Sequence, residues 1–185
     1  MDRLIPETTA LFVVDVQEKL AAAMPPAAIE NVVHHTSILL DAARLLGVAV
    51  VVSEQYPKGL GPTVAPLAQK LSEQGITPFS KMTFDACSDL AIARALSNTK
   101  ARAVVVVGME SHVCVFQTAR ELVRRGYATY VVEDAVVSRR EENRQIGLSL
   151  CEKAGAILTA TETVVFDWLE QAGTDAFKAI SKLVK

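Results

Sequence analysis

The chain has 185 residues, of which 50% are hydrophobic and 22% are charged, and its formal net charge is −2. This length favours one domain, and a half-hydrophobic composition excludes an intrinsically disordered chain. Lysines and arginines are spread along the chain without a basic excess, so the composition gives no support for nucleic-acid binding.

Short apolar, β-branched runs alternate with longer segments of helical periodicity. Six runs predict strands, at residues 10–14, 48–52, 76–79, 103–107, 128–132 and 156–158. Continuous apolar runs are typical of strands that are buried on both faces of a parallel sheet. We therefore predict an α/β fold with three α-β-α layers, Rossmann-like, as one domain over residues 1–185.

The segments between these runs predict helices, at residues 29–46, 89–96, 115–123, 138–155, 164–171 and 175–184. Gly47 stands where a helix C-cap glycine belongs, and Ser138 to Glu141 matches a capping box that opens a helix. The last helix presents an apolar face, formed by Phe177, Ile180, Leu183 and Val184. This face packs either on the chain's own core or on a neighbouring subunit.

The three cysteines, Cys87, Cys114 and Cys151, form neither an even disulfide framework nor a zinc-ligand pattern. Reduced thiols favour a cytoplasmic location. The first residues lack a basic segment followed by a long apolar run, and no apolar stretch approaches the roughly 20 residues that span a bilayer. We expect neither a signal peptide nor a membrane span.

Three reactive side chains follow predicted strands, where ligands bind in open α/β sheets. Asp15 ends the first run, Lys81 follows the third, and Cys114 lies after the fourth at the start of a helix. A helix N-terminus stabilises a thiolate, and its free N–H groups receive an oxyanion. Each residue also has an ordinary alternative: a turn cap, a solvent-exposed lysine and a structural cysteine, respectively.

Nucleotide cofactors are not expected. No glycine-rich dinucleotide fingerprint follows the first run, and the chain contains no phosphate-binding loop of the GxxxxGK[ST] type. Cys87 and Cys151 lie on helix-like segments, where a structural role is favoured.

Asp15, Lys81 and Cys114, in this order at the ends of different strands, resemble the isochorismatase-like (cysteine hydrolase) superfamily over nearly the whole chain. The resemblance implies a six-stranded parallel sheet, with Asp15 as the base, Cys114 as the nucleophile and Lys81 as their ion-pair partner. It also implies a cis peptide bond between Met109 and Glu110, in a turn that aims the N–H groups of residues 110 and 114 at the oxyanion.

The substrate pocket is expected to include Gln17, Tyr56, Phe84 and His112. Glu110 either adds negative charge near the thiol or turns away from it.

A metal ion is not expected. The nicotinamidases of this superfamily bind a metal through Asp-x-His after the second strand and through a further histidine. Here Glu54 could replace that aspartate, but Tyr56 stands in place of the histidine. Metals of this kind prefer imidazole or thiolate ligands, so we predict no metal and no other cofactor.

The stretch 53–63 is particularly similar to the isochorismatase domain-containing proteins, a metal-lacking subgroup. We predict a metal-independent cysteine hydrolase that acts on a small amide or related C–N bond through a thioester. The alternatives are a non-catalytic binding or scaffold protein of the same fold and a ribonuclease, a label that some subgroup members carry. The expected partner is a small-molecule substrate, with no nucleic acid and no membrane.

A homo-oligomer is expected from the high apolar fraction and the C-terminal helix.

Overall fold

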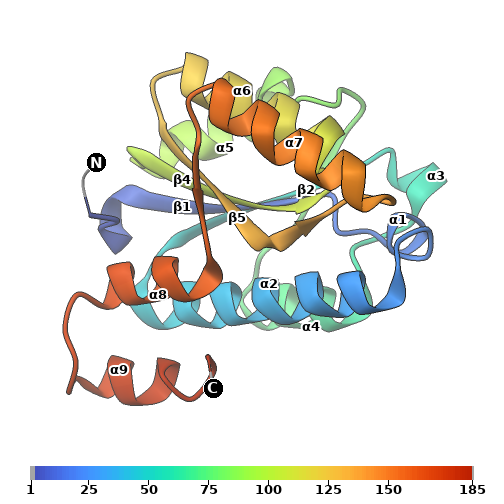
Figure 1. The fold of residues 1–185 in the computed structure, drawn as a ribbon. Coiled ribbons are helices and arrows are strands. Elements are labelled where there is room, and N and C mark those ends of the chain that lie inside the picture. Colours follow the sequence, from blue (N-terminus) through green and yellow to red (C-terminus); the bar gives the residue numbers. More distant parts are fainter. Residues whose placement is uncertain (1–2, 185) are drawn as a thin grey trace.

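The computed structural model describes residues 3–184 and contains a six-stranded parallel sheet with helices on both faces (Figure 1). The strand order is β3-β2-β1-β4-β5-β6, and neighbouring strands pair in parallel. The strands are β1 (Thr9–Val14), β2 (Ala49–Gln55), β3 (Phe79–Lys81), β4 (Ala103–Met109), β5 (Ala128–Val137) and β6 (Ile157–Thr159). The predicted α/β fold with a six-stranded parallel sheet is confirmed.

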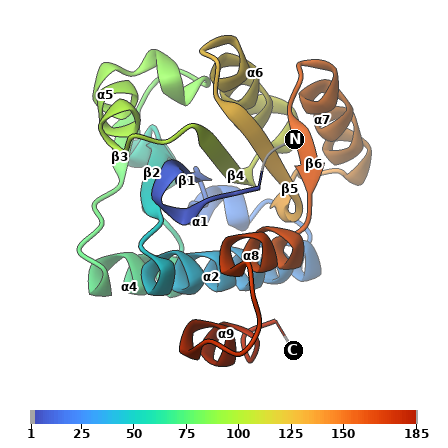
Figure 2. The ribbon, with the colours of Figure 1, turned by 90° about the vertical axis from the view of Figure 1, so that its left-hand side faces the viewer.

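Helices α2, α4 and α8 cover one face of the sheet, and α5, α6 and α7 cover the other (Figures 1 and 2). The helices are α1 (Glu18–Ala21), α2 (Pro26–Leu46), α3 (Pro57–Leu60), α4 (Ala65–Glu73), α5 (Leu90–Asn98), α6 (Phe116–Arg124), α7 (Glu141–Lys153), α8 (Thr161–Leu169) and α9 (Asp175–Ile180). A π-helical turn (Ser111–Val115) joins β4 to α6.

Strand β1 shows why the apolar runs are continuous. All six of its residues are buried, and successive side chains point to opposite faces. Leu11 and Val13 belong to the core that includes Leu39 of α2, whereas Phe12 belongs to the core that includes Leu122 of α6. Both faces of the sheet are covered, so neither face needs polar residues.

Two strands differ from their predicted positions. Strand β3 begins at Phe79 rather than at residue 76, because Pro78 has no N–H group to donate to the sheet. Strand β5 continues to Val137 rather than ending at residue 132, and its register against β4 shifts between Val106 and Gly108. Helix α4 was not predicted, because only two of its nine side chains, Leu67 and Leu71, are buried.

Helix α7 begins two residues later than the capping-box pattern with Ser138 at the N-cap predicts. Its first residue is Glu141, and Arg140 occupies the N-cap position without a side-chain capping bond. The Ser138 hydroxyl has other partners, which are described below. At the end of α2, Gly47 adopts the predicted left-handed conformation with φ 72°.

The C-terminal apolar face packs on the chain's own core. Ile180 of α9 is fully buried, and Phe177, Leu183 and Val184 pack against the core that contains α2 and α8. A neighbouring subunit is therefore not needed to cover this face, and α9 ends at Ile180 rather than at residue 184. Within residues 3–184, no helix combines the length and apolar character needed to cross a membrane.

Candidate active site

The three candidate catalytic residues lie together at the carboxyl edge of the sheet. Asp15 directly follows β1 and has a left-handed φ of 53°, Lys81 is the last residue of β3, and Cys114 lies in the π-helical turn after β4. The Lys81 Nζ atom is 2.7 Å from Asp15 Oδ2, and the Cys114 thiol interacts with both side chains. All three residues are buried.

Two polar side chains of β2 complete the surroundings of this ion pair. The Ser53 hydroxyl donates a hydrogen bond of 2.8 Å to Asp15 Oδ1, and Lys81 Nζ donates one of 2.7 Å to Gln55 Oε1. Lys81 also donates to the main-chain oxygens of Thr83 and Phe84. A buried ion pair is tolerated when further hydrogen bonds satisfy its polar atoms, and these contacts supply them.

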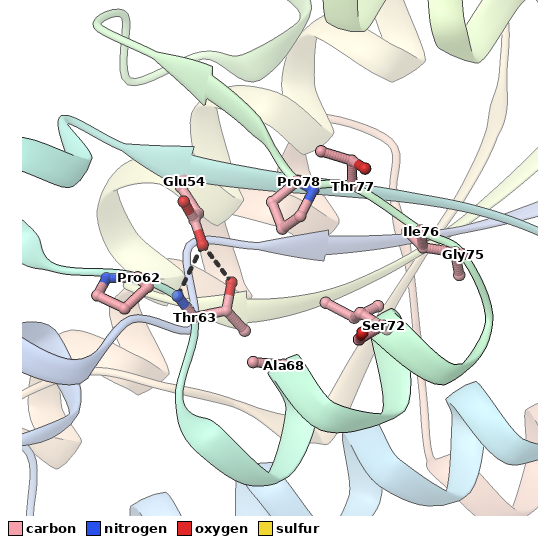
Figure 3. Close-up of a pocket in the computed structure, with 10 residues that line it drawn as sticks. Glu54, Pro62, Thr63, Ala68, Ser72, Gly75, Ile76, Thr77 and Pro78 are labelled. Carbon is pink, nitrogen blue, oxygen red and sulfur yellow. Dashed lines mark hydrogen bonds between the residues drawn. The ribbon is translucent and has the colours of Figure 1, made fainter.

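Sequence reasoning missed Ser53 and Gln55, although the alternation of a strand could have indicated them. Residues 53 and 55 share one face of β2, so Glu54 between them points to the opposite face. Glu54 Oε1 accepts hydrogen bonds of 2.7 Å from both the main-chain N–H and the hydroxyl of Thr63, at a cavity of about 410 Å³ beside α4 (Figure 3). Glu54 therefore does not replace a metal-binding aspartate beside the triad.

The part of the chain that the structure describes holds no group of three or more His, Cys, Asp or Glu side chains suited to a metal ion. The expectation of a metal-free site stays a prediction.

The Cys114 thiol differs from the thiolate that a helix N-terminus predicts. Its pKa is raised to about 12, mainly by burial and also by the Asp15 carboxylate, and the Lys81 ammonium offsets part of this shift. Burial also raises the pKa of Cys87 and of Cys151 to about 12. What distinguishes Cys114 is therefore its neighbours and not its pKa, and its resting form is the neutral thiol.

The turn before Cys114 contains a cis peptide bond between Met109 and Glu110, the position that the resemblance implies. The Glu110 side chain is buried, and its Oε2 atom accepts hydrogen bonds from the main-chain N–H (3.1 Å) and the Nε–H (3.0 Å) of Arg139. Glu110 therefore faces Arg139, whose guanidinium balances its charge.

Two of the four expected pocket residues form hydrogen bonds within the chain. Gln17 is fully buried and exchanges two hydrogen bonds with the main chain of Gln55, and its amide also donates to the Gly61 oxygen. This side chain braces the loop after β2, and its place in the substrate pocket stays a prediction. His112 is partly buried, and its Nδ1 atom lies 3.0 Å from the Ser138 hydroxyl.

The other two pocket candidates are exposed near the site. Tyr56 follows β2 with a φ of 39°, and the residue is 48% exposed. Phe84 is 54% exposed, and its main-chain oxygen accepts a hydrogen bond from Lys81. Both rings are accessible to a ligand at the carboxyl edge of the sheet.

Comparison with known proteins places the chain in a family. The Isochorismatase domain model matches residues 9–163. The chain is 38% identical to the secreted isochorismatase effector Isc1 of Phytophthora sojae, over 100% of this chain and 88% of that protein. It is 37% identical to isochorismatase domain-containing protein 2 of Bos taurus, over 100% and 87% of the two chains. Because the first of these relatives is secreted, a cytoplasmic location stays a prediction.

A solved structure supports the same assignment. The structure of MAR1 ribonuclease from Caenorhabditis elegans superimposes with a TM-score of 0.91 at 38% identity and covers 99% of this chain and 92% of that chain. The family model, the full-length relatives and the shared fold lead to one conclusion: the chain belongs to the isochorismatase family of hydrolases.

Proposed function

We propose that this protein is a metal-independent cysteine hydrolase that cleaves a small amide or related C–N bond through a thioester on Cys114. The observation that carries the proposal is the buried Asp15–Lys81 ion pair beside the Cys114 thiol. The catalytic unit is the single domain formed by residues 1–185.

Asp15 is the general base in this proposal. A thiol pKa near 12 leaves roughly one part in 10⁵ as thiolate at pH 7, so the thiol must lose its proton as it reacts. Asp15 accepts that proton while Cys114 Sγ attacks the carbonyl carbon. The N–H groups of residues 110 and 114 receive the oxyanion.

The second half of the cycle returns the proton. Asp15 protonates the departing amine as the C–N bond breaks, which leaves an acyl thioester on Cys114. A water molecule then attacks the thioester while Asp15 removes its proton. The carboxylic acid leaves, and Cys114 recovers its thiol.

Lys81 supplies a fixed positive charge. Its ammonium is held by Gln55 Oε1 and by the Thr83 and Phe84 main-chain oxygens, in addition to Asp15. A charge held in this way stabilises the Asp15 carboxylate and the negative charge that develops on the substrate.

The surface beside the site supports a small substrate and a second copy of the chain. A cavity of about 450 Å³ is lined by Lys81, Met82, Thr83 and Leu90 among others. Met82, Phe84 and Leu90 are 69%, 54% and 74% exposed. Three large apolar side chains on one segment favour a homo-oligomer that covers them.

The test is release of ammonia from a panel of small primary amides by the wild type, Cys114→Ala and the matched control Cys151→Ala. We expect activity in the wild type and in Cys151→Ala, none in Cys114→Ala, and an acyl adduct on Cys114 by mass spectrometry. Equal activity in Cys114→Ala overturns the proposal. If no amide is hydrolysed and no adduct forms, the scaffold alternative gains support.

The name of the Caenorhabditis elegans protein raises the ribonuclease alternative for this chain. The net charge of −2 gives no electrostatic support for it. Cleavage of single-stranded RNA that disappears in Cys114→Ala, together with salt-sensitive RNA binding, would favour this alternative over amide hydrolysis.

A further inference from the structure

One segment holds the turn that carries Cys114 at three separate places. This segment comprises residues 138–147, from the end of β5 into the first turns of α7, and is here called the α7 strap. Its contacts are to residues 110–112, which end two residues before Cys114. These contacts join parts of the chain that are 26 to 36 residues apart.

The first contact is a chain of hydrogen bonds. The Ser138 hydroxyl lies 2.5 Å from the Ser111 hydroxyl and 3.0 Å from His112 Nδ1. Ser111 and Ser138 are both buried. The local sequence predicts Ser138 as a helix cap, yet its hydroxyl is used between two elements instead.

The second contact is the pair formed by Arg139 and Glu110. Both the main-chain N–H and the Nε–H of Arg139 donate to Glu110 Oε2. A main-chain donor is fixed by the fold, so this contact holds the buried carboxylate even when the exposed guanidinium moves.

The third contact is a close approach of two backbones. A Cβ atom on Gly147 would lie 2.5 Å from both the His112 nitrogen and the Ser111 carbonyl carbon. These are main-chain atoms, so no side-chain rotation can make room. Glycine is disfavoured inside helices, and its place in α7 is explained by this approach.

We propose that the α7 strap sets the position of the Cys114 sulfur relative to Asp15 and Lys81, with Ser138 and Gly147 as positioning residues. Asp15 and Lys81 reach the thiol from β1 and β3, whereas the strap holds the turn from β5 and α7. The correct distance between nucleophile and base therefore depends on both groups of elements. This inference rests on the proposed role of Cys114 as the nucleophile.

A looser turn has two opposite consequences. Burial and the Asp15 carboxylate raise the pKa of Cys114 by more than the Lys81 ammonium lowers it, so the pKa falls when the thiol moves away from all three influences. Cys114 should then react more readily with iodoacetamide. Amide hydrolysis should become slower, because the thiol no longer meets its base in the right geometry.

The experiment uses Ser138→Ala, with Ser149→Ala, an exposed serine within α7, as the matched control. The alkylation rate of each cysteine is measured against pH by mass spectrometry, with Cys87 as the internal reference. We expect the Cys114 profile of Ser138→Ala to move down by about one pH unit, which is about tenfold in rate below the midpoint. Cys87 should not change, and turnover should fall. Ser138→Thr, which keeps the hydroxyl, should restore the Cys114 alkylation profile and the turnover rate toward those of the wild type.

Gly147→Ala tests the same proposal by disturbing packing instead of a hydrogen bond. We expect the alkylation profile of Cys114 to move to lower pH, as in Ser138→Ala, and that of Cys87 to stay unchanged. The proposal is overturned if Ser138→Ala and Gly147→Ala behave like Ser149→Ala. It is also overturned if Cys87 shifts together with Cys114, because this indicates general loosening of the fold. If the Cys114 alkylation profile shifts as expected but the wild type hydrolyses no amide, the positioning role of the α7 strap is supported and only the proposed reaction is overturned.

Discussion

The Lys81 ammonium lies 2.7 Å from Asp15 Oδ2, and neither side chain is exposed. Replacing one partner of such a pair leaves an uncompensated buried charge, at a cost of about 3–5 kcal/mol. We expect Lys81→Met to lower the free energy of unfolding by this amount.

The matched control for this prediction is Lys70→Met. Lys70 forms an ion pair of the same length with Asp41, but both side chains are partly exposed. Surface pairs contribute about 1 kcal/mol or less. Urea unfolding measures both variants, and equal losses would contradict the importance of burial at the site.

Asp15→Asn should separate thiol ionisation from catalysis. The Asp15 carboxylate raises the pKa of Cys114, so its removal should move the Cys114 alkylation profile to lower pH. Amide hydrolysis should nevertheless fall by about 10²- to 10⁴-fold, because the general base is lost. Asp41→Asn, on the partly exposed pair, serves as the control. A profile that moves to higher pH is the contrary result.

The buried thiols predict a loss of stability at alkaline pH. The pKa of Cys151 is raised from 9.0 to about 12 by burial, so the folded state keeps a proton that the unfolded state loses. The resulting stabilisation is complete below pH 9 and is lost as the pH rises toward 12. At pH 10 the loss is about 1.4 kcal/mol for one thiol.

Cys151→Ala measures this contribution. We expect the difference in free energy of unfolding between wild type and Cys151→Ala to shrink by about 1.4 kcal/mol between pH 8 and pH 10. Urea unfolding at the two pH values gives the difference. The titration of lysines and tyrosines affects the stability of both proteins alike, so it cancels in this difference. A difference that does not depend on pH would show that burial does not raise the pKa of Cys151.

Gly108→Ala should disrupt the pairing of β1 with β4. Gly108 has a φ of 120°, and an added Cβ would lie 2.0 Å from the main-chain oxygen of Val14. We expect a loss of more than about 3 kcal/mol, since two backbones must move apart.

Gly173→Ala is the control for the conformational part of this loss. Gly173 also has a positive φ, of 88°, but nothing lies within 4 Å of an added Cβ. Its expected loss is about 1–2 kcal/mol. Thermal unfolding compares the two variants, and similar losses would mean that the close approach to Val14 is relieved without cost.

Local patterns misled where residues far apart in the sequence compete for the same group. Ser138 to Glu141 matches a capping box, but the Ser138 hydroxyl bonds Ser111 and His112 instead. The helix N-terminus predicts a thiolate at Cys114, but burial and the Asp15 charge raise its pKa. In both cases the long-range contact outweighs the local one, and no window of the sequence contains it.

The sequence by itself determined that the sheet is parallel and that Asp15, Lys81 and Cys114 follow three of its strands. Continuous apolar runs require strands that are covered on both faces, and parallel strands bring Asp15, Lys81 and Cys114 to one edge whatever the details of packing. Only the tertiary structure decided which neighbours these residues have. Ser53 and Gln55 lie beside the ion pair because of the face of β2 on which they stand, and the protonation of Cys114 follows from burial and from charges that distant segments supply.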